Sequence, residues 1–196
     1  MGYEGFDCFQ LDEKHDLWRG WLPDDLRCDD ETFEEIWNLH PPEYHDVRMH
    51  GRWVKTPRWQ QAYNRDYTYT GSKNNALPTP PQLQEFVDWT KQEIDSRLNG
   101  ILLNWYDAAE GHYIGKHRDK TTDLIPGSPI VTISLGEGRK FRLRPWRGEG
   151  FQDFDAVDGS VFVLPFDTNE TWTHEVPHSK KHCGRRISIT IRAFAD

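Results

Sequence analysis

The sequence lacks the features of secreted and membrane proteins. It has only three cysteines in 196 residues, Cys8, Cys28 and Cys183, and no CxxC pair. An odd number of widely spaced cysteines argues against a disulfide framework and a thiolate zinc site. No stretch approaches the roughly 18 apolar residues of a membrane span, and the N-terminus has no basic start followed by an apolar run. We therefore expect a soluble protein that does not bind membranes, in the cytoplasm, or in the nucleus of a eukaryote.

An excess of positive charge is also missing, since the formal net charge is −8. The acidic residues are concentrated in an acidic N-terminal segment, residues 1–50, which holds 14 acidic and 4 basic residues. Residues 51–196 hold 18 acidic and 20 basic residues, so this part of the chain could still meet a nucleic acid. Charge leaves the partner open, and nothing in the sequence indicates an obligate protein partner.

Bulky side chains are abundant, with nine Trp and ten Phe, and a chain of this length suits one domain over residues 1–196. Acids in the first turn and spaced apolar residues predict a helix over 29–39, and the Pro80 start predicts another that ends near Gly100. Between them, residues 40–78 suggest loops and short hairpins. From residue 101 to 196, short apolar strands alternate with turns, which predicts a mostly β sandwich or barrel with flanking helices.

One pattern points to a metal. His117 and Asp119 follow a strand-like segment, and positions two apart on a strand share a face about 7 Å apart. His174 is the natural third ligand, although His178 and His182 compete with it. Two His and one carboxylate on one side of an ion leave open positions, as in non-haem Fe(II) oxygenases. A His-x-Asp alone is weak evidence, because such pairs occur by chance and isolated histidines are more often not ligands.

The segment 185–194 predicts a strand with two different faces. Its isoleucines share one face, and the opposite face is polar: Arg186, Ser188, Thr190 and Arg192. Two arginines on an inward face, at the ends of a strand about 20 Å long, would leave a gap that suits a short dicarboxylate. The alternative is an edge strand with a solvated basic face.

From about Gly20 to Phe194 the chain resembles the AlkB family of Fe(II)/2-oxoglutarate dioxygenases. The matching pieces are Asn104–Tyr106, His117–Asp119, Pro129–Gly136, His174 and Arg186–Arg192. The resemblance implies a double-stranded β-helix, or jelly-roll, core and iron on His117, Asp119 and His174. The twelve residues from His174 to Arg186 match the family's animal DNA-repair branch, which favours His174 over its two competitors.

The resemblance also implies a site for 2-oxoglutarate, which would chelate the iron through its keto-acid end. Arg186 would pair with the distal carboxylate beside Tyr106, and Arg192 and Asn104 would hold the carboxylate nearer the iron. Ser188 lies on the same predicted face and joins these co-substrate residues.

Upstream, the resemblance implies a nucleotide-recognition segment within residues 40–78. Its matching pieces are Gly51–Trp53, Pro57–Arg58 and Tyr67–Gly71. Arg58, Tyr67 and Tyr69 would bind substrate, with Tyr69 stacking a flipped base against the first iron ligand. The alternative for these aromatic residues is ordinary packing over the sheet.

Two departures from the family pattern bear on the substrate. Repair enzymes of this family usually carry an acid two residues after the metal Asp, where this chain has Thr121. Their apolar wedge is replaced here by His50. With Thr121 in place of the acid, a cationic base would have no counter-charge, and with His50 in place of the wedge, a duplex would not be intercalated. Both changes weaken the case for repair of cationic lesions in duplex DNA.

The sequence therefore predicts an enzyme that uses Fe(II), 2-oxoglutarate and O2 to hydroxylate or demethylate an alkylated nucleobase in DNA or RNA. A hydroxylase of a small molecule or amino acid on the same scaffold is the alternative, favoured by Thr121, His50 and the acidic N-terminal segment. A non-catalytic jelly-roll binding module is a third possibility.

Overall fold

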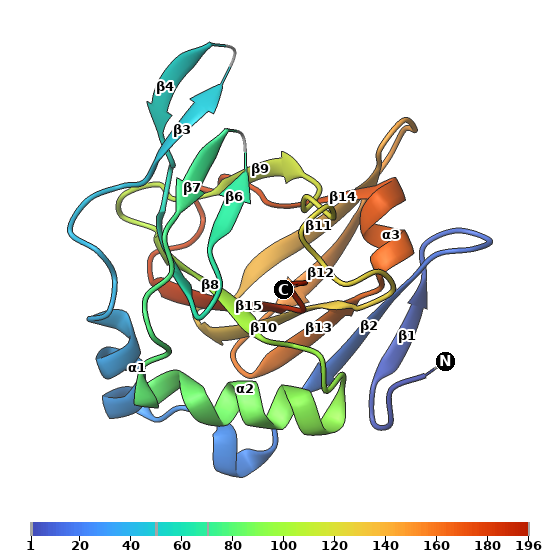
Figure 1. Ribbon diagram of the computed structural model, residues 1–196, viewed down its shortest axis with the longest axis horizontal. Coiled ribbons are helices and arrows are strands. Elements are labelled where there is room, and N and C mark those ends of the chain that lie inside the picture. Colours follow the sequence, from blue (N-terminus) through green and yellow to red (C-terminus); the bar gives the residue numbers. More distant parts are fainter. Residues whose placement is uncertain (1, 50, 70, 196) are drawn as a thin grey trace.

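The computed structural model describes residues 2–49, 51–69 and 71–195, so the predicted wedge position His50 lies outside the described residues. Two antiparallel sheets face each other (Figure 1). The larger sheet runs, in spatial order, β1 (Asp7–Gln10), β2 (Asp16–Trp21), β13 (Ser160–Leu164), β10 (Ile130–Gly136), β15 (Arg185–Arg192), β8 (Gly100–Asp107) and β5 (Trp59–Tyr63). The smaller sheet runs β12 (Gln152–Ala156), β11 (Arg139–Pro145), β14 (Trp172–Val176) and β9 (Ile114–His117).

Two hairpins and three α-helices flank the sheets; the hairpins and the first two helices were predicted from the sequence, and the third helix was not. The hairpins pair β3 (Asp46–Met49) with β4 (Arg52–Lys55) and β6 (Tyr67–Tyr69) with β7 (Ser72–Asn74). The helices are α1 (Asp30–Trp37), α2 (Pro81–Glu93) and α3 (Phe166–Thr171), with a short 3-10 helix at Asp24–Leu26. In the described part of the chain, no helix has both the length and the apolar character to cross a membrane.

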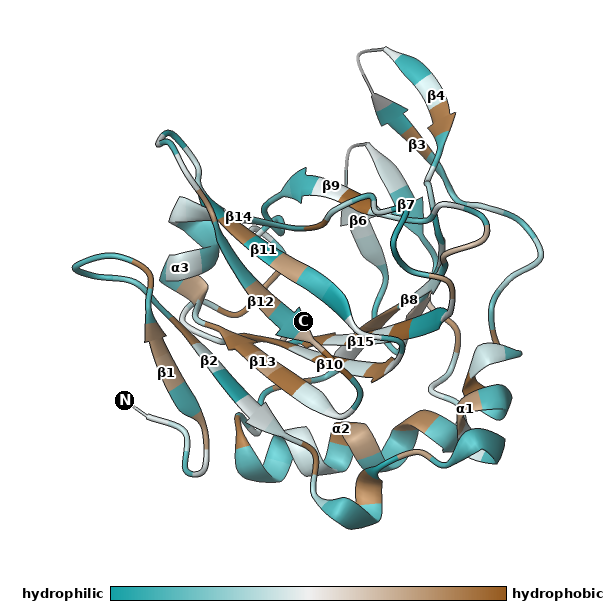
Figure 2. Cartoon of the chain, turned by 180° about the vertical axis from the view of Figure 1, so that it is seen from behind, coloured by the Kyte–Doolittle hydropathy of each residue, from teal (hydrophilic) through white to brown (hydrophobic). Residues whose placement is uncertain are grey.

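The larger sheet is apolar on its outer face, whereas its inner face is polar along β15 and packs apolar side chains of β2, β10 and β13 against the smaller sheet. The isoleucines of β15 are fully buried with side chains of α1 and α2, which cover the outer face. Figure 2 shows apolar segments concentrated on β13 and β10, while α2 carries hydrophilic residues on its outside. The polar residues of β15 point inward, toward the smaller sheet, where they line a cavity. The alternation predicted for residues 185–194 is therefore confirmed.

The first helix begins where the sequence predicted, because the Asp29 carboxylate accepts a hydrogen bond from the Thr32 N–H at 2.9 Å. The second helix starts as expected but ends at Glu93, so the predicted end near Gly100 is wrong. The Asp95 carboxylate accepts from the backbone N–H and the guanidinium of Arg97, and this local bonding competes with the helix. Leu98 remains buried, which explains why the helical spacing seemed to continue.

Several strands were not predicted. β1, β2 and β5 belong to the larger sheet although they precede residue 101, so that sheet extends beyond the predicted β-rich range. The helix α3 and the strand β14, which carries His174, were not predicted either. The sequence of β14, WTHEV, contains three polar residues, and the strand lines the cavity. These polar residues hide the apolar alternation by which a strand is predicted.

Candidate active site

The three predicted metal ligands meet at one end of the smaller sheet. His117 ends β9 and His174 lies directly opposite it on β14. Asp119 follows two residues later, and its Oδ1 is 3.9 Å from the Nε2 atom of each histidine. One ligand atom from each residue lies within 4.8 Å of the others, and among the described residues this is the group that could hold a metal ion. The distances suit three ligands around one ion.

Burial keeps both histidines neutral, which is the form of imidazole that binds a metal. The Nδ1–H of His117 donates to the Gly115 carbonyl at 2.8 Å, which leaves the lone pair of Nε2 toward Asp119. Burial lowers the pKa of His117, and it lowers the pKa of His174 to about 3. The competing histidines lie elsewhere: His178 is exposed near the ring of Tyr113, and His182 is 3.5 Å from Glu137.

The carboxylate of Asp119 is held on both oxygens. The Arg192 Nε donates to Oδ2 at 2.8 Å and its Nη2 lies 2.7 Å from the same oxygen in an ion pair, while the Tyr67 hydroxyl donates to Oδ1 at 3.0 Å. Burial alone would raise the pKa of Asp119, but Arg192 and the two ligand histidines hold it well below its usual value. The residue therefore stays anionic, as a metal ligand must.

The backbone of Asp119 is also fixed, by a residue that the sequence analysis missed. Asn169 of α3 accepts from the Asp119 N–H at 2.9 Å and donates to the Asp119 carbonyl at 3.0 Å. Its side chain is fully buried. An Asn five residues before a candidate ligand carries no sequence signal, because the contact joins two segments that are 50 residues apart in the chain. The short helix α3 thus positions Asp119 and leads directly into the strand that carries His174.

The donor set fits Fe(II). Two imidazole nitrogens and one carboxylate oxygen on one side of an ion leave coordination positions free for a co-substrate and O2. No thiolate contributes, since the three cysteines are separate and free.

A buried arginine without an acid partner lies in the same cavity. Arg186 is 1% exposed, and its Nη2 donates to the Ser134 hydroxyl at 2.8 Å. Its Nε and Nη1 have no hydrogen-bond partner among the described residues. The guanidinium lies over the Tyr106 ring, 5.2 Å from the centroid. Burial lowers the pKa of Arg186 to about 10, so the group remains charged at neutral pH. A buried, unpaired charge is costly, and an anionic ligand would relieve that cost.

The other predicted co-substrate residues lie on the same inward face. Tyr106 pairs across the strands with Arg186, and Asn104 with Ser188. The Arg192 guanidinium donates to Asp119, and the side-chain amide oxygen of Asn104 accepts from the Arg58 Nε at 2.7 Å. Among the described residues, Arg186 has two nitrogens without a hydrogen-bond partner and Arg192 has one, Nη1.

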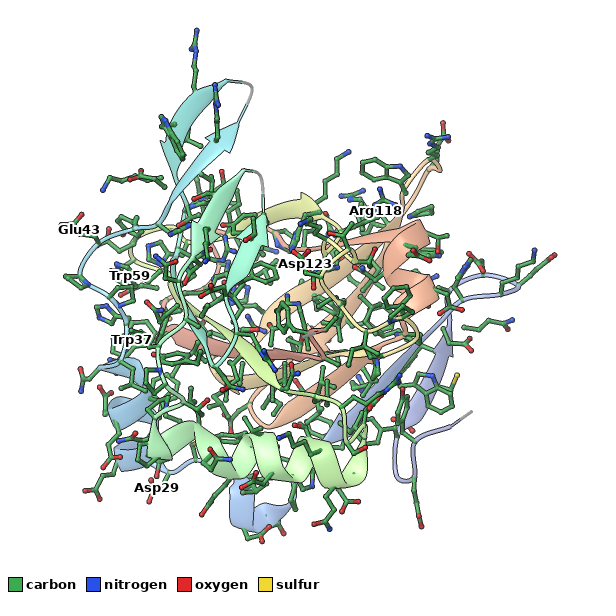
Figure 3. The ribbon with its side chains drawn as sticks, viewed as in Figure 1. Asp29, Trp37, Glu43, Trp59, Arg118 and Asp123 are labelled. Carbon is green, nitrogen blue, oxygen red and sulfur yellow. The ribbon has the colours of Figure 1, made fainter. Side chains whose placement is uncertain are left out.

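The candidate metal ligands, the predicted co-substrate residues and the predicted substrate residues all line one cavity of about 1000 Å³. Arg58, Tyr67, Tyr69 and Thr121 all line it. Tyr67 faces the metal group through Asp119, whereas the Tyr69 hydroxyl donates to Gln60 at 2.9 Å and its side chain is half-buried. Trp37 and Trp59, labelled at the left of Figure 3, have ring centroids 6.2 Å apart and pack with the core cluster under α1 and α2.

Comparison with known proteins agrees with this geometry. The sequence model of the 2OG-Fe(II) oxygenase superfamily matches residues 25–192. The human protein "DNA oxidative demethylase ALKBH2" is 31% identical over 157 residues, which cover 74% of this chain and 60% of that protein. The chain thus spans about 60% of the length of this curated relative.

Solved structures show the same fold at low identity. The structure of OsALKBH1 superposes with a TM-score of 0.60 at 14% identity, over 95% of this chain and 99% of that one. A prolyl-4-hydroxylase from Pseudomonas putida superposes with a TM-score of 0.57 at 15% identity, over 93% and 94% of the two chains. The predicted mostly β, jelly-roll fold is confirmed, as are the predicted enzyme class and its cofactors, Fe(II), 2-oxoglutarate and O2. The chain belongs to the 2OG-Fe(II) oxygenase superfamily, as an AlkB-like member.

Proposed function

We propose that this protein is an Fe(II)/2-oxoglutarate-dependent dioxygenase that removes an alkyl group from a nucleobase in DNA or RNA by oxidising it. The observation that carries the co-substrate part is the buried, unpaired Arg186 in the same cavity as His117, Asp119 and His174. A metal triad alone fits many reactions, but a triad beside an unpaired cation fits a metal-chelating acid with a second carboxylate.

The bound metal and co-substrate supply O2 activation: 2-oxoglutarate becomes succinate and CO2, and one oxygen atom enters a C–H bond of the substrate. If that carbon is an N-methyl group, the hydroxymethyl product leaves as formaldehyde, and the net result is demethylation.

The side chains of the protein bind and orient. His117, Asp119 and His174 hold the metal on one side, while Tyr67 and Arg192 keep the carboxylate anionic and fixed. Arg186 binds the distal carboxylate of the co-substrate through its two free nitrogens.

The relatives and the cavity support a nucleobase as substrate. The human relative is named a DNA oxidative demethylase. Tyr69 and Arg58 line the cavity from the β5–β6 region and offer an aromatic face and a cation to a base. Neither feature is restricted to DNA, so RNA remains part of the proposal.

A second candidate, hydroxylation of a small molecule, is favoured by Thr121. A cationic methylated base would need a nearby negative charge, and the described acids that line the cavity besides Asp119 are Glu170 and Glu175. Arg144 already pairs with Glu175 at 2.8 Å. A neutral substrate has no need of such a charge.

A succinate-release screen separates the two candidates. The loaded enzyme is offered methylated oligonucleotides and a panel of metabolites, with Asp119→Ala as the inactive control. Formaldehyde release that matches succinate release on an oligonucleotide is the expected result. Coupled turnover on metabolites alone would replace the nucleobase with a small molecule.

A further inference from the structure

A large aromatic side chain is exposed at the mouth of the cavity. Trp146 follows β11 and is 49% exposed, yet it lines the same cavity as the metal ligands. Two other tryptophans in the described part of the chain, Trp21 and Trp53, are also exposed, but they do not line the cavity. The Trp146 backbone N–H donates to the Thr171 carbonyl at the end of α3, at 2.9 Å. The ring is therefore attached to the helix that also positions Asp119.

An arginine lies over this ring. The Arg118 guanidinium carbon is 4.2 Å from the Trp146 centroid, and its Nη1 donates to the Glu170 carbonyl of α3. Arg118 stands between the ligands His117 and Asp119 in the chain, and Figure 3 places it beside α3. We call Trp146 and Arg118 the mouth platform. Hydrogen bonds to carbonyls of α3 hold both residues, and Arg118 is the chain neighbour of both His117 and Asp119.

The surroundings of the mouth platform suit a phosphate backbone. Lys116 and Lys120 are exposed and line the same cavity, and Lys120 reaches Asp123 at 2.8 Å. Among the described residues that line this cavity, Glu170 is the exposed acidic one. Figures 1 and 2 show the β11–β12 loop and the β3–β4 hairpin projecting at the same end of the molecule, with β9 between them. A strand could lie across this end.

We infer that the mouth platform stacks the nucleotide next to the modified base, so that the substrate is a strand rather than a free nucleotide. The inference rests on the proposed function and narrows its substrate class. An exposed indole offers a π-face on which any base can stack. Because the guanidinium already holds the ring in place, the side chain loses little conformational entropy on binding. Phosphate contacts from Lys116 would add affinity without sequence preference.

The test is a double-mutant cycle between the protein and an abasic substrate. Fluorescence anisotropy measures binding of single-stranded pentanucleotides with a central methylated base, to enzyme loaded with Mn(II) and 2-oxoglutarate. Trp146→Ala should bind about 5- to 150-fold more weakly than wild type. The loss should vanish when one particular neighbour of the methylated base is abasic, which identifies the stacked position.

Two further variants make the test specific. Trp146→Tyr keeps an aromatic face and should retain most of the affinity. Trp21→Ala is the matched control, because Trp21 is 44% exposed and also lies near an arginine, Arg19 at 5.9 Å, but does not line the cavity. It should bind like wild type.

Equal binding by Trp146→Ala and wild type would overturn the inference, as would a loss that persists at every abasic position. If wild type nonetheless demethylates these oligonucleotides, only the mouth platform is refuted. If wild type neither binds nor turns over any oligonucleotide, the nucleobase substrate falls as well.

Discussion

Arg186 offers a prediction in which affinity and stability change in different directions. Its guanidinium is 1% exposed, donates to Ser134, and has two nitrogens without a hydrogen-bond partner among the described residues. Without co-substrate it is a buried charge that lacks a counter-charge. With co-substrate it becomes half of a shielded ion pair. Replacing it with Met keeps the length of the side chain and removes the charge.

We expect Arg186→Met to weaken 2-oxoglutarate binding by about 2 to 5 kcal/mol, because the distal carboxylate would be buried without its partner. That range corresponds to roughly 30- to 4000-fold in the dissociation constant. The unloaded variant should be no less stable than wild type, since an apolar residue replaces an unpaired charge. Arg186→Lys should recover only part of the affinity, because an ammonium group cannot form the two-pronged contact.

Calorimetric titration of 2-oxoglutarate into Mn(II)-loaded protein measures the affinity, and urea unfolding of the unloaded protein measures the stability. Arg185→Met is the matched control: it is the neighbouring residue on β15, is partly exposed, and forms an ion pair with Glu34. It should leave the affinity for 2-oxoglutarate unchanged. A destabilised Arg186→Met with unchanged affinity would show that Arg186 is a structural residue and would refute this reasoning.

Three other changes test the site and the substrate. Asn169→Leu should weaken Mn(II) binding by about 10- to 100-fold, measured by titration, because it frees the backbone of Asp119; Asn99→Leu, which breaks the same kind of amide clamp on Phe194, should not, and equal effects would contradict the positioning role. Thr121→Asp should raise turnover of a cationic methylated base relative to a neutral one, because it restores a negative charge near the base; an unchanged ratio would place the base elsewhere. Tyr69→Ala should cost about 1 to 3 kcal/mol of oligonucleotide binding in an anisotropy assay; no loss would mean that Tyr69 only packs.

The sequence predicted the parts of this protein that have a regular pattern. Alternation on residues 185–194 identified the inward arginines, and a His-x-Asp after a strand identified two of the three candidate ligands that the structure brings together. Partners that depend on tertiary contacts were not predictable. The clamp from Asn169 to Asp119, and the engagement of Arg192 by Asp119, join segments 50 and 73 residues apart.

The prediction of secondary structure was wrong where local sequence preferences and tertiary contacts favour different structures. β14 is a strand because it pairs with β11 and β9, although its own sequence is polar. The helix α2 ends early because Asp95 bonds to Arg97, although its apolar spacing continues to Leu98. Packing and side-chain bonding override the local pattern in both cases.

We propose that His117, Asp119 and His174 together hold the Fe(II) ion to which 2-oxoglutarate binds. Its most direct test is a visible absorption titration of Fe(II) and 2-oxoglutarate without O2, in wild type, His174→Ala and His178→Ala. We predict a weak charge-transfer band, saturating at one Fe(II) per chain, in wild type and in His178→Ala but not in His174→Ala. A band that persists in His174→Ala, or is lost in His178→Ala, would contradict the assignment of the metal site.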